Sequence, residues 1–213
     1  MKIVKNRAEP ILSFIKGKDV LEIGCVGMGK HDTIGGKNFI AGYVMPISRK
    51  WVGVDINEKG VAKLRKMGFN ALVIDVEKPF NLKQKFDIIL AEEVLEHLSN
   101  LPTFFENVKM HLKEDGLLII TTPNPISPPF FIQRLFGGKI KDISVDSHMF
   151  WQTHETLINL LKKHSFKVIY VEYIHPEPAE PPIYYPFVKL LWKIVPSIFG
   201  RNLLVIAKKE EKR

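Results

Sequence analysis

A series of short apolar segments, separated by stretches with helical periodicity, constrains the fold of this 213-residue chain more than any other feature. A strand buried on both faces is apolar throughout, whereas a helix repeats its apolar residues every three or four positions. We expect strands at residues 20–23, 51–55, 71–75, 86–91, 117–122, 167–173 and 202–208, and helices at residues 6–16, 58–67, 101–112 and 154–164. Apolar strands that alternate with helices predict an α/β fold, a single doubly wound domain over residues 1–213 with a mostly parallel sheet. Two additions, at 30–50 and 174–200, interrupt the alternation.

The composition fits a folded protein in a reducing compartment. The chain is 46% apolar and 25% charged, and Cys25 is its only cysteine, so an internal disulfide is excluded. No apolar run reaches the roughly 18 residues that a membrane span needs. The net charge of +8 permits an acidic partner, but the basic residues form no dense cluster apart from the mixed tail at 208–213. We therefore expect a cytoplasmic protein, and nucleic acid is not the favoured partner.

The segment VLEIGCVGMGKH, residues 20–31, has the composition of a strand that turns into a nucleotide-binding loop. It nearly matches the phosphate loop of nucleoside triphosphatases, in which the lysine is followed by a serine or threonine that holds Mg²⁺. His31 occupies that position, and Glu22 would repel a triphosphate. The glycine spacing G-x-x-G-x-G also differs from the G-x-G-x-x-G of dinucleotide-binding folds. An acid followed by glycines instead suits a loop that holds S-adenosylmethionine (SAM).

Acidic residues stand at the ends of three successive predicted strands: Glu22, Asp55 and Asp75. In an open parallel sheet the carboxyl ends of the strands lie along one edge, where ligands bind. SAM carries a sulfonium cation, a ribose diol and an adenine amine, and a carboxylate can accept hydrogen bonds from the diol and the amine. This order of acids therefore indicates a SAM site more specifically than the glycines do.

Six segments, in chain order, carry a resemblance to a known family: VLEIGCVG, WVGVDI, ALVIDVE, FDIILAEEVLEHL, HLKEDGLLIITTPNP and HMFWQTHETLINLLKKHSFKV. Together they resemble class I SAM-dependent methyltransferases, close to the group that includes ubiquinone-type and many glycan-cluster methyltransferases. The resemblance covers about residues 20–173 and the last predicted strand. It implies a Rossmann-like sheet of seven strands with the seventh antiparallel, SAM as the methyl donor and S-adenosylhomocysteine as the product. The cofactor-binding residues that it implies are Glu22, Gly24, Cys25, Gly27, Asp55, Ile56, Asp75, Val76, Ala91 and Glu92.

The chain departs from the family pattern in two places. Val26 occupies the second expected glycine position, and Gly27 and Gly29 follow one residue late. The connection between the first two acids is also long, and its second part, NFIAGYVMPISRK, predicts a helix that Pro46 kinks or ends.

His97, in the segment EEVLEHL just past the fourth predicted strand, is the candidate general base. Methyl transfer is a displacement on an activated sulfonium, so a base is needed only when the acceptor must lose a proton. An imidazole suits that role near neutral pH, although a histidine that caps or packs the local helix fits the pattern equally. Glu93 is a candidate partner for a substrate cation, and Glu96 is expected to face water. The segment lacks the paired histidines of HExxH, so we assign no metal ligand.

Three further segments are candidates for the acceptor side. His148, Phe150 and Trp151 precede the helix at 154–164, and in the family that the chain resembles this region borders the acceptor pocket, although core packing is favoured for Phe150. Segments 123–139 and 181–200 are candidates for the wall of that pocket. Residues 181–200 predict a helix that is apolar nearly all round. Packing on the domain's own core is its simplest interpretation, and the alternatives are a lid, a homodimer contact or peripheral membrane contact.

The sequence thus predicts methyl transfer from SAM to a small-molecule or lipid-like acceptor. Two alternatives stay open. The first is a nucleic-acid methyltransferase, which the segment AEEV at 91–94 disfavours because it lacks the N/D-P-P-Y/F tetrad of enzymes that methylate base amines. The second is a protein that binds SAM without catalysis.

Overall fold

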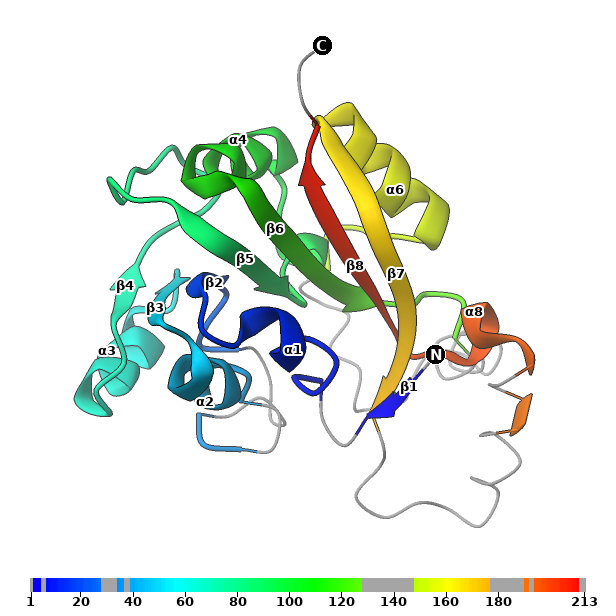
Figure 1. Cartoon of the computed structure of the whole chain (residues 1–213), viewed down its shortest axis with the longest axis horizontal. Helices are drawn as coiled ribbons and strands as arrows, with labels where there is room; N and C mark the ends of the chain where they lie inside the picture. The colour runs from blue at the N-terminus through cyan, green and yellow to red at the C-terminus, as the bar shows by residue number, and fades with distance from the viewer. Residues whose placement is uncertain are drawn as a thin grey trace.

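One sheet of eight strands organises the part of the chain that the computed structural model describes, which is residues 2–4, 7–27, 34–36, 39–127, 148–176, 190–191 and 194–210. The strand order is β1-β7-β8-β6-β5-β2-β3-β4 (Figure 1). The strands are β1 (Lys2–Val4), β2 (Asp19–Ile23), β3 (Lys50–Asp55), β4 (Ala71–Val73), β5 (Phe86–Glu92), β6 (Leu112–Pro123), β7 (Phe166–Pro176) and β8 (Asn202–Lys209).

The strand directions match the predicted fold. β2 pairs in parallel with β3 and β5, β3 with β4, and β5 with β6, whereas β8 runs antiparallel to both of its neighbours, β6 and β7. The seven predicted strands correspond to β2 through β8, so the mostly parallel sheet with an antiparallel last strand is confirmed. β1 adds an eighth strand, parallel to the end of β7. Its three residues are too few to give a periodic signal in the sequence.

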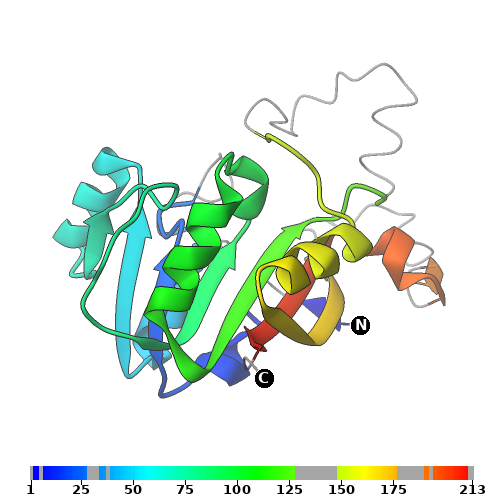
Figure 2. The ribbon, with the colours of Figure 1, turned by 90° about the horizontal axis from the view of Figure 1, so that it is seen from above.

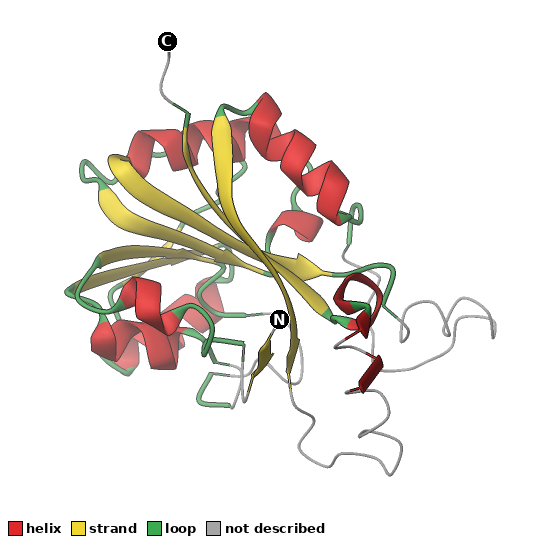
Figure 3. Cartoon of the chain, turned by 45° about the vertical axis from the view of Figure 1, so that its right-hand side comes forward, coloured by secondary structure: helices red, strands yellow, loops and turns green. Residues whose placement is uncertain are grey.

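Helices cover both faces of the sheet (Figure 3). α4 (Leu101–His111) and α6 (His154–Lys163) lie on one face, the near one in Figure 2, and contribute to one hydrophobic cluster. α1 (Leu12–Ile15), α2 (Ala41–Val44) and α3 (Glu58–Lys66) contribute to a second cluster on the other face. A sheet covered in this way buries both sides of its strands, which is why the strands are apolar throughout.

Polar caps fix where three of these helices begin. The side chain of Asn57 accepts a hydrogen bond from the Gly60 amide at the start of α3, and that of Asn100 accepts from the Thr103 amide at the start of α4. Thr153 forms a reciprocal capping box at the start of α6. Because α3 begins three residues after β3 ends, its cap also fixes the backbone that leaves β3.

Some predicted boundaries differ from the structure. Within the helix predicted at 6–16, residues 7–11 form turns and the single turn of α1 follows, because Pro10 lacks an amide donor and lies just before it. In the addition at 30–50, α2 ends at Val44 and the chain continues as the 3₁₀ helix η1 (Met45–Ile47), which contains Pro46, in line with the predicted kink or end there. Residues 30–33 and 37–38 of that region lie outside the described residues.

Much of the second addition also lies outside the described residues, namely 177–189 and 192–193, as does 128–147. The helix predicted within 181–200 and most of the proposed pocket wall at 123–139 therefore have no structural test. The described end of this region contains the short helix α8 (Pro196–Phe199). None of the helices in the described ranges has the length and apolarity that a bilayer crossing requires.

Candidate cofactor and acceptor site

The carboxyl ends of β2, β3, β4 and β5 meet at one edge of the sheet (Figure 1). Ile23 is paired with Val54 on one side and with Ala91 on the other, and Asp55 is paired with Val73. The residues that follow these positions therefore share one edge. They include the predicted cofactor residues Gly24, Asp55, Asp75, Ala91 and Glu92.

The loop after β2 turns on two glycines. Gly24 and Gly27 have φ angles of +75° and +74°, a region that residues with a side chain rarely adopt. The Gly27 amide donates to the Gly24 carbonyl at 3.1 Å and closes the turn. A Cβ atom at Gly24 would lie 2.6 Å from Cγ2 of Val94, so this position also lacks space for a side chain. Gly27, which comes one residue later than in the family pattern, thus supplies the positive φ that the turn requires. Gly29 lies outside the described residues.

Cys25 and Val26, between these glycines, point into the core, with 2% and 7% of their surface exposed. Burial raises the pKa of the Cys25 thiol, so the side chain is a packing group and not a thiolate nucleophile.

Asp55 ties the loop after β2 to the start of α3. Its Oδ2 accepts a hydrogen bond from the Val26 amide at 2.9 Å, and its Oδ1 accepts from the Asn57 amide at 2.8 Å. The next side chain, that of Ile56, is 67% exposed. An exposed apolar side chain beside a carboxylate offers one surface for a flat ring and one acceptor for hydroxyl groups.

Asp75 and Val76 follow β4. The Asp75 carboxylate accepts from the Glu77 amide at 3.0 Å and pairs with Lys78 at 3.1 Å, and the Lys78 hydrogen bond lowers its pKa. Val76 is buried, and its carbonyl accepts from Nδ2 of Asn107 at 3.0 Å.

Glu22 lies one residue before the end of β2 and is 3% exposed. Its Oε2 accepts a hydrogen bond from Nε1 of Trp51 at 2.8 Å. Burial raises the pKa of Glu22 to about 8, and the negative charge of Glu92 acts in the same direction. The Glu22 carboxyl group is therefore buried beneath the loop after β2 and is not exposed to solvent.

Arg7 is a charged partner at this edge that sequence reasoning missed. Its Nε lies 3.0 Å from Oε1 of Glu92 and its guanidinium reaches Glu93, whose φ is +52°. Glu93 also accepts from Nδ2 of Asn202 at 3.0 Å. Arg7 lies far from β5 in sequence, and a lone arginine in an N-terminal segment gives no signal of this pairing.

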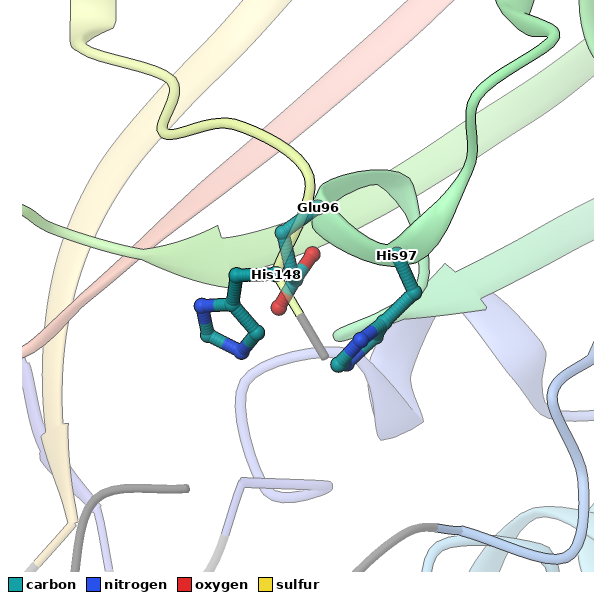
Figure 4. Close-up of side chains that lie close together, drawn as sticks. All are labelled: Glu96, His97 and His148. Atoms are coloured by element: carbon teal, nitrogen blue, oxygen red, sulfur yellow. The ribbon is translucent and has the colours of Figure 1, made fainter. Parts of the chain in front are cut away.

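A second group of side chains lies just past β5, in the 3₁₀ helix η2 (Leu95–His97) and in the segment before α6. Figure 4 shows Glu96, His97 and His148 gathered there, with one donor atom of each within 4.8 Å of the others. The two imidazole centroids are 4.7 Å apart, and His148 also contacts the ring of Trp151. The Met149 amide donates to the Glu96 carbonyl at 2.7 Å, which holds the two segments together.

The expectation that Glu96 faces water is wrong. The side chain is 1% exposed, because η2 turns it inward against β6, where Oγ1 of Thr122 donates to its Oε2 at 3.3 Å. Its Oε1 has no hydrogen-bond partner among the described residues. Burial raises the pKa of Glu96 well above its usual value.

Comparison with known proteins decides the family. Residues 3–171 match the model of a family described as "Methyltransferase domain". The chain belongs to this methyltransferase family. SAM is the methyl donor that the family implies, and the residues that carried the resemblance lie within the matched range.

Individual relatives agree with this assignment. The methyltransferase is 31% identical, over 54% of its length and 50% of the relative's, to a ubiquinone biosynthesis O-methyltransferase of Glaesserella parasuis. It is 27% identical to a probable SAM-dependent methyltransferase of Mycobacterium tuberculosis, over 61% of its own length and 48% of the relative's. The chain thus spans about half the length of the curated relatives it matches. A solved SAM-dependent methyltransferase from Archaeoglobus fulgidus shares its fold, with a TM-score of 0.64 at 21% identity over 95% of this chain and 91% of the other.

The Glu96 group, formed by Glu96, His97 and His148, gives the methyltransferase a set of donors beside the candidate cofactor edge. Two imidazoles and one carboxylate are ligands that divalent transition-metal ions accept. The same groups could instead pass a proton to or from an acceptor. The sequence assigned no metal ligand because EEVLEH lacks the paired histidines of HExxH. His148 is far from this segment along the chain, and in the structure the Met149 backbone contact helps to hold it beside His97.

Proposed function

We propose that this chain transfers the methyl group of SAM to a small-molecule or lipid-like acceptor. The observation that carries the proposal is the shared edge of β2, β3, β4 and β5, where the glycine turn, Asp55 and Asp75 follow one another. This order suits the amino-acid tail, the ribose and the adenine of one extended ligand. S-adenosylhomocysteine would be the product.

The roles of the site residues follow from their places along this edge. Gly24, Cys25 and Gly27 would present backbone groups to the amino-acid tail, near Glu22, because their turn leaves no side chain in the way. The other residues would contact the rest of the cofactor. The ribose would meet Asp55 and Ile56, the adenine would meet Asp75 and Val76, and the central part would meet Ala91 and Glu92.

His97 is the proposed general base for acceptors that must lose a proton. It stands one turn past β5, beside His148, on the side of the edge away from β3 and β4. Displacement at the sulfonium methyl needs an acceptor atom in line with the leaving sulfur, so the protein's main contribution is alignment.

Exposed apolar side chains favour an acceptor with an apolar part. Ile126 and Met149 are 50% and 62% exposed, and Ile198 is 41% exposed. Asn124 donates to the carbonyls of Ser197 and Gly200 at 2.8 Å each, which places α8 beside the turn that contains Ile126. These side chains lie near the carboxyl end of β6, next to the proposed acceptor side.

The proposal includes a cytoplasmic location, which the single cysteine favours. Membrane association through 181–200 and a homodimer stay predictions, since most of that segment lies outside the described residues. A single domain over 1–213 is likewise a prediction. Proteins named ubiquinone biosynthesis O-methyltransferase are the relatives that make a quinone-like acceptor the first to test.

Calorimetry and a methyl-transfer assay test the proposal together. We expect wild-type protein to bind SAM and S-adenosylhomocysteine but not ATP with Mg²⁺. Asp55→Ala should weaken SAM binding by about tenfold or more, because the ribose loses a charged acceptor and Val26 loses its partner. His97→Ala should keep SAM affinity and lose methyl transfer to phenolic acceptors.

Three results would contradict parts of this proposal. Equal loss of SAM affinity in both variants would refute the division of roles. SAM binding without transfer to phenol, amine or carboxylate acceptors would favour the non-catalytic alternative. Transfer to oligonucleotides alone would favour the nucleic-acid alternative.

A further inference from the structure

The side chain of Trp51 runs along the sheet toward the cofactor edge. Trp51 and Gly53 lie on the same face of β3, where they pair with Val20 and Glu22 of β2. Trp51 is 5% exposed. A Cβ atom at Gly53 would lie 2.3 Å from Cη2 of Trp51 and 2.7 Å from Sγ of Cys25. The indole therefore occupies the space that a side chain at residue 53 would need, and its N–H reaches Glu22.

Two further aromatic rings hold the indole in this position. The Phe69 ring meets the Trp51 ring edge-on at 5.5 Å, and Phe39 meets Phe69 at the same centroid distance. Phe39 belongs to the long connection between β2 and β3, the region in which this chain departs from the family pattern. Phe39 of the additional segment thus supports, through the Phe69 ring, the Trp51 side chain that donates to Glu22.

The hydrogen bond to Glu22 matters because the carboxyl group is buried. Burial disfavours the ionised acid, whereas an N–H donor stabilises it. For Glu22 burial has the larger effect, and the Trp51 hydrogen bond opposes it. SAM brings a sulfonium and an ammonium group, and a carboxylate attracts these cations more strongly than a neutral acid does.

We propose that Trp51 is a positioning residue for SAM binding, which orients the Glu22 carboxyl group beneath the glycine turn through its indole N–H. The inference rests on the proposed contact of Glu22 with the cofactor's tail. It assigns a role to a residue that the sequence pattern treats as an ordinary member of a buried strand.

The inference makes SAM affinity depend on pH. Glu22 binds the cofactor's cations best when ionised, so affinity should rise as pH increases through its pKa of about 8. Other titratable groups near Glu22 are the Cys25 thiol, Asp55 at the end of β3 and Glu92 at the end of β5, which Arg7 pairs. The amino group of SAM titrates as well, but equally for every protein variant.

The experiment is a double-mutant cycle on SAM binding, measured by calorimetry from pH 6 to pH 9 in the wild type, Trp51→Phe, Glu22→Gln and the double variant. Trp51→Phe keeps an aromatic ring and removes the N–H, so SAM affinity at pH 7 should fall by about tenfold. The midpoint of its pH profile should move to higher pH. In the Glu22→Gln background the same change at Trp51 should alter neither quantity.

Controls separate this role from a loss of packing. Phe166→Leu removes a buried ring on β7, outside the cluster that contains Trp51, and should lower the melting temperature without moving the pH profile. If Trp51→Phe fails to fold, Gly53→Ala replaces it, because the added methyl group would lie 2.3 Å from Cη2 of Trp51 and the indole must shift to admit it, while its N–H is kept. The same methyl group would lie 2.7 Å from Sγ of Cys25, so the pH midpoint is the readout that reports on Glu22.

Each outcome decides between the proposals. An unchanged pH midpoint in Trp51→Phe, or an equal effect of that change with and without Glu22, overturns the positioning role while the proposed function stands. Failure of the wild type to bind SAM at any pH overturns the proposed function itself.

Discussion

Glu96 places a buried carboxyl group in the candidate site, and its burial has a free-energy cost. A buried carboxyl group whose Oε1 has no partner among the described residues is costly, because that oxygen has lost its water and gained no hydrogen bond in exchange. His97 and His148 stand beside it with donor atoms in reach. A proton can neutralise this group, and a divalent cation shared with the two imidazoles can do so as well.

We expect Mn²⁺ or Zn²⁺ to raise the melting temperature of the wild type, since an ion that binds only the folded state stabilises it, by about 2.7 kcal/mol at one hundred times its Kd. His148→Ala should abolish that increase. His164→Ala is the matched control, because this half-buried imidazole stacks on Phe105 outside the group. Scanning calorimetry with and without a chelator measures the effect, and an equal increase in both variants would contradict the prediction.

At the scale of elements, one side chain fastens the segment after β4 to the start of α4. Oε1 of Glu77 accepts from the Ser99 amide and the Asn100 amide at 2.6 Å each, and from Oγ of Ser99 at 2.7 Å. These hydrogen bonds, with that of Ser99 first, lower the pKa of Glu77. Val76, on the proposed adenine side, is thereby held between β4 and α4.

Glu77→Ala should lower stability by about 1–3 kcal/mol, because two backbone amides lose a charged acceptor. For a chain of this size that corresponds to a fall in melting temperature of about 2–4 °C per kcal/mol. The control is Glu106→Ala, which removes an exposed ion pair with Lys109 and should change stability by less than about 1 kcal/mol. Thermal unfolding followed by circular dichroism distinguishes them, and similar values for the two variants would refute this account.

At the scale of the whole molecule, ion pairs link the strands at the edge of the sheet opposite the candidate cofactor residues. Arg49 donates two hydrogen bonds to Asp19, at 2.8 and 2.6 Å, and Lys113 reaches both Asp19 and Asp87. The Arg49 hydrogen bond is the main cause that lowers the pKa of Asp19 to about 2. The pairing joins the starts of β2 and β5 to the segments before β3 and within β6.

Asp19→Asn should lower stability at pH 7 by about 1 kcal/mol, a value reduced from the size of the pKa shift because Arg49 is exposed. A folded-state pKa below the unfolded value stabilises the protein above the unfolded pKa of about 3.9. That contribution is lost as pH falls through about 2. Urea unfolding at several pH values should therefore show a difference at pH 7 that disappears near pH 2, and a difference independent of pH would contradict the prediction.

Much of the fold and part of the site were predictable from the sequence because their signals are local. Apolar runs predict strands. The order of the acids along the chain predicts a ligand-binding edge before any contact is known, and these acids are Glu22, Asp55 and Asp75. The α-helix before Pro46 gives way to a 3₁₀ turn, as the predicted kink or end requires, because the amide that proline lacks affects only its own turn.

The remaining features depend on pairs that only the fold creates. Arg7 meets Glu92, and His148 meets His97, across long separations that carry no periodic signal. Trp51 reaches Glu22 only because β2 and β3 are paired in one particular register. Glu96 turns inward because η2 packs against β6, which a helical pattern in a six-residue segment does not indicate.

The position of β8 has a consequence for the order of assembly. β8 lies between β6 and β7 but comes last among the described strands along the chain. During synthesis, β7 leaves the ribosome before β8, the strand that links it to the rest of the sheet. β1 leaves first of all, and a longer stretch of chain separates it from its neighbour β7. The half of the sheet that carries the glycine turn and the acids can pair first, whereas closure of the other half must wait for β8.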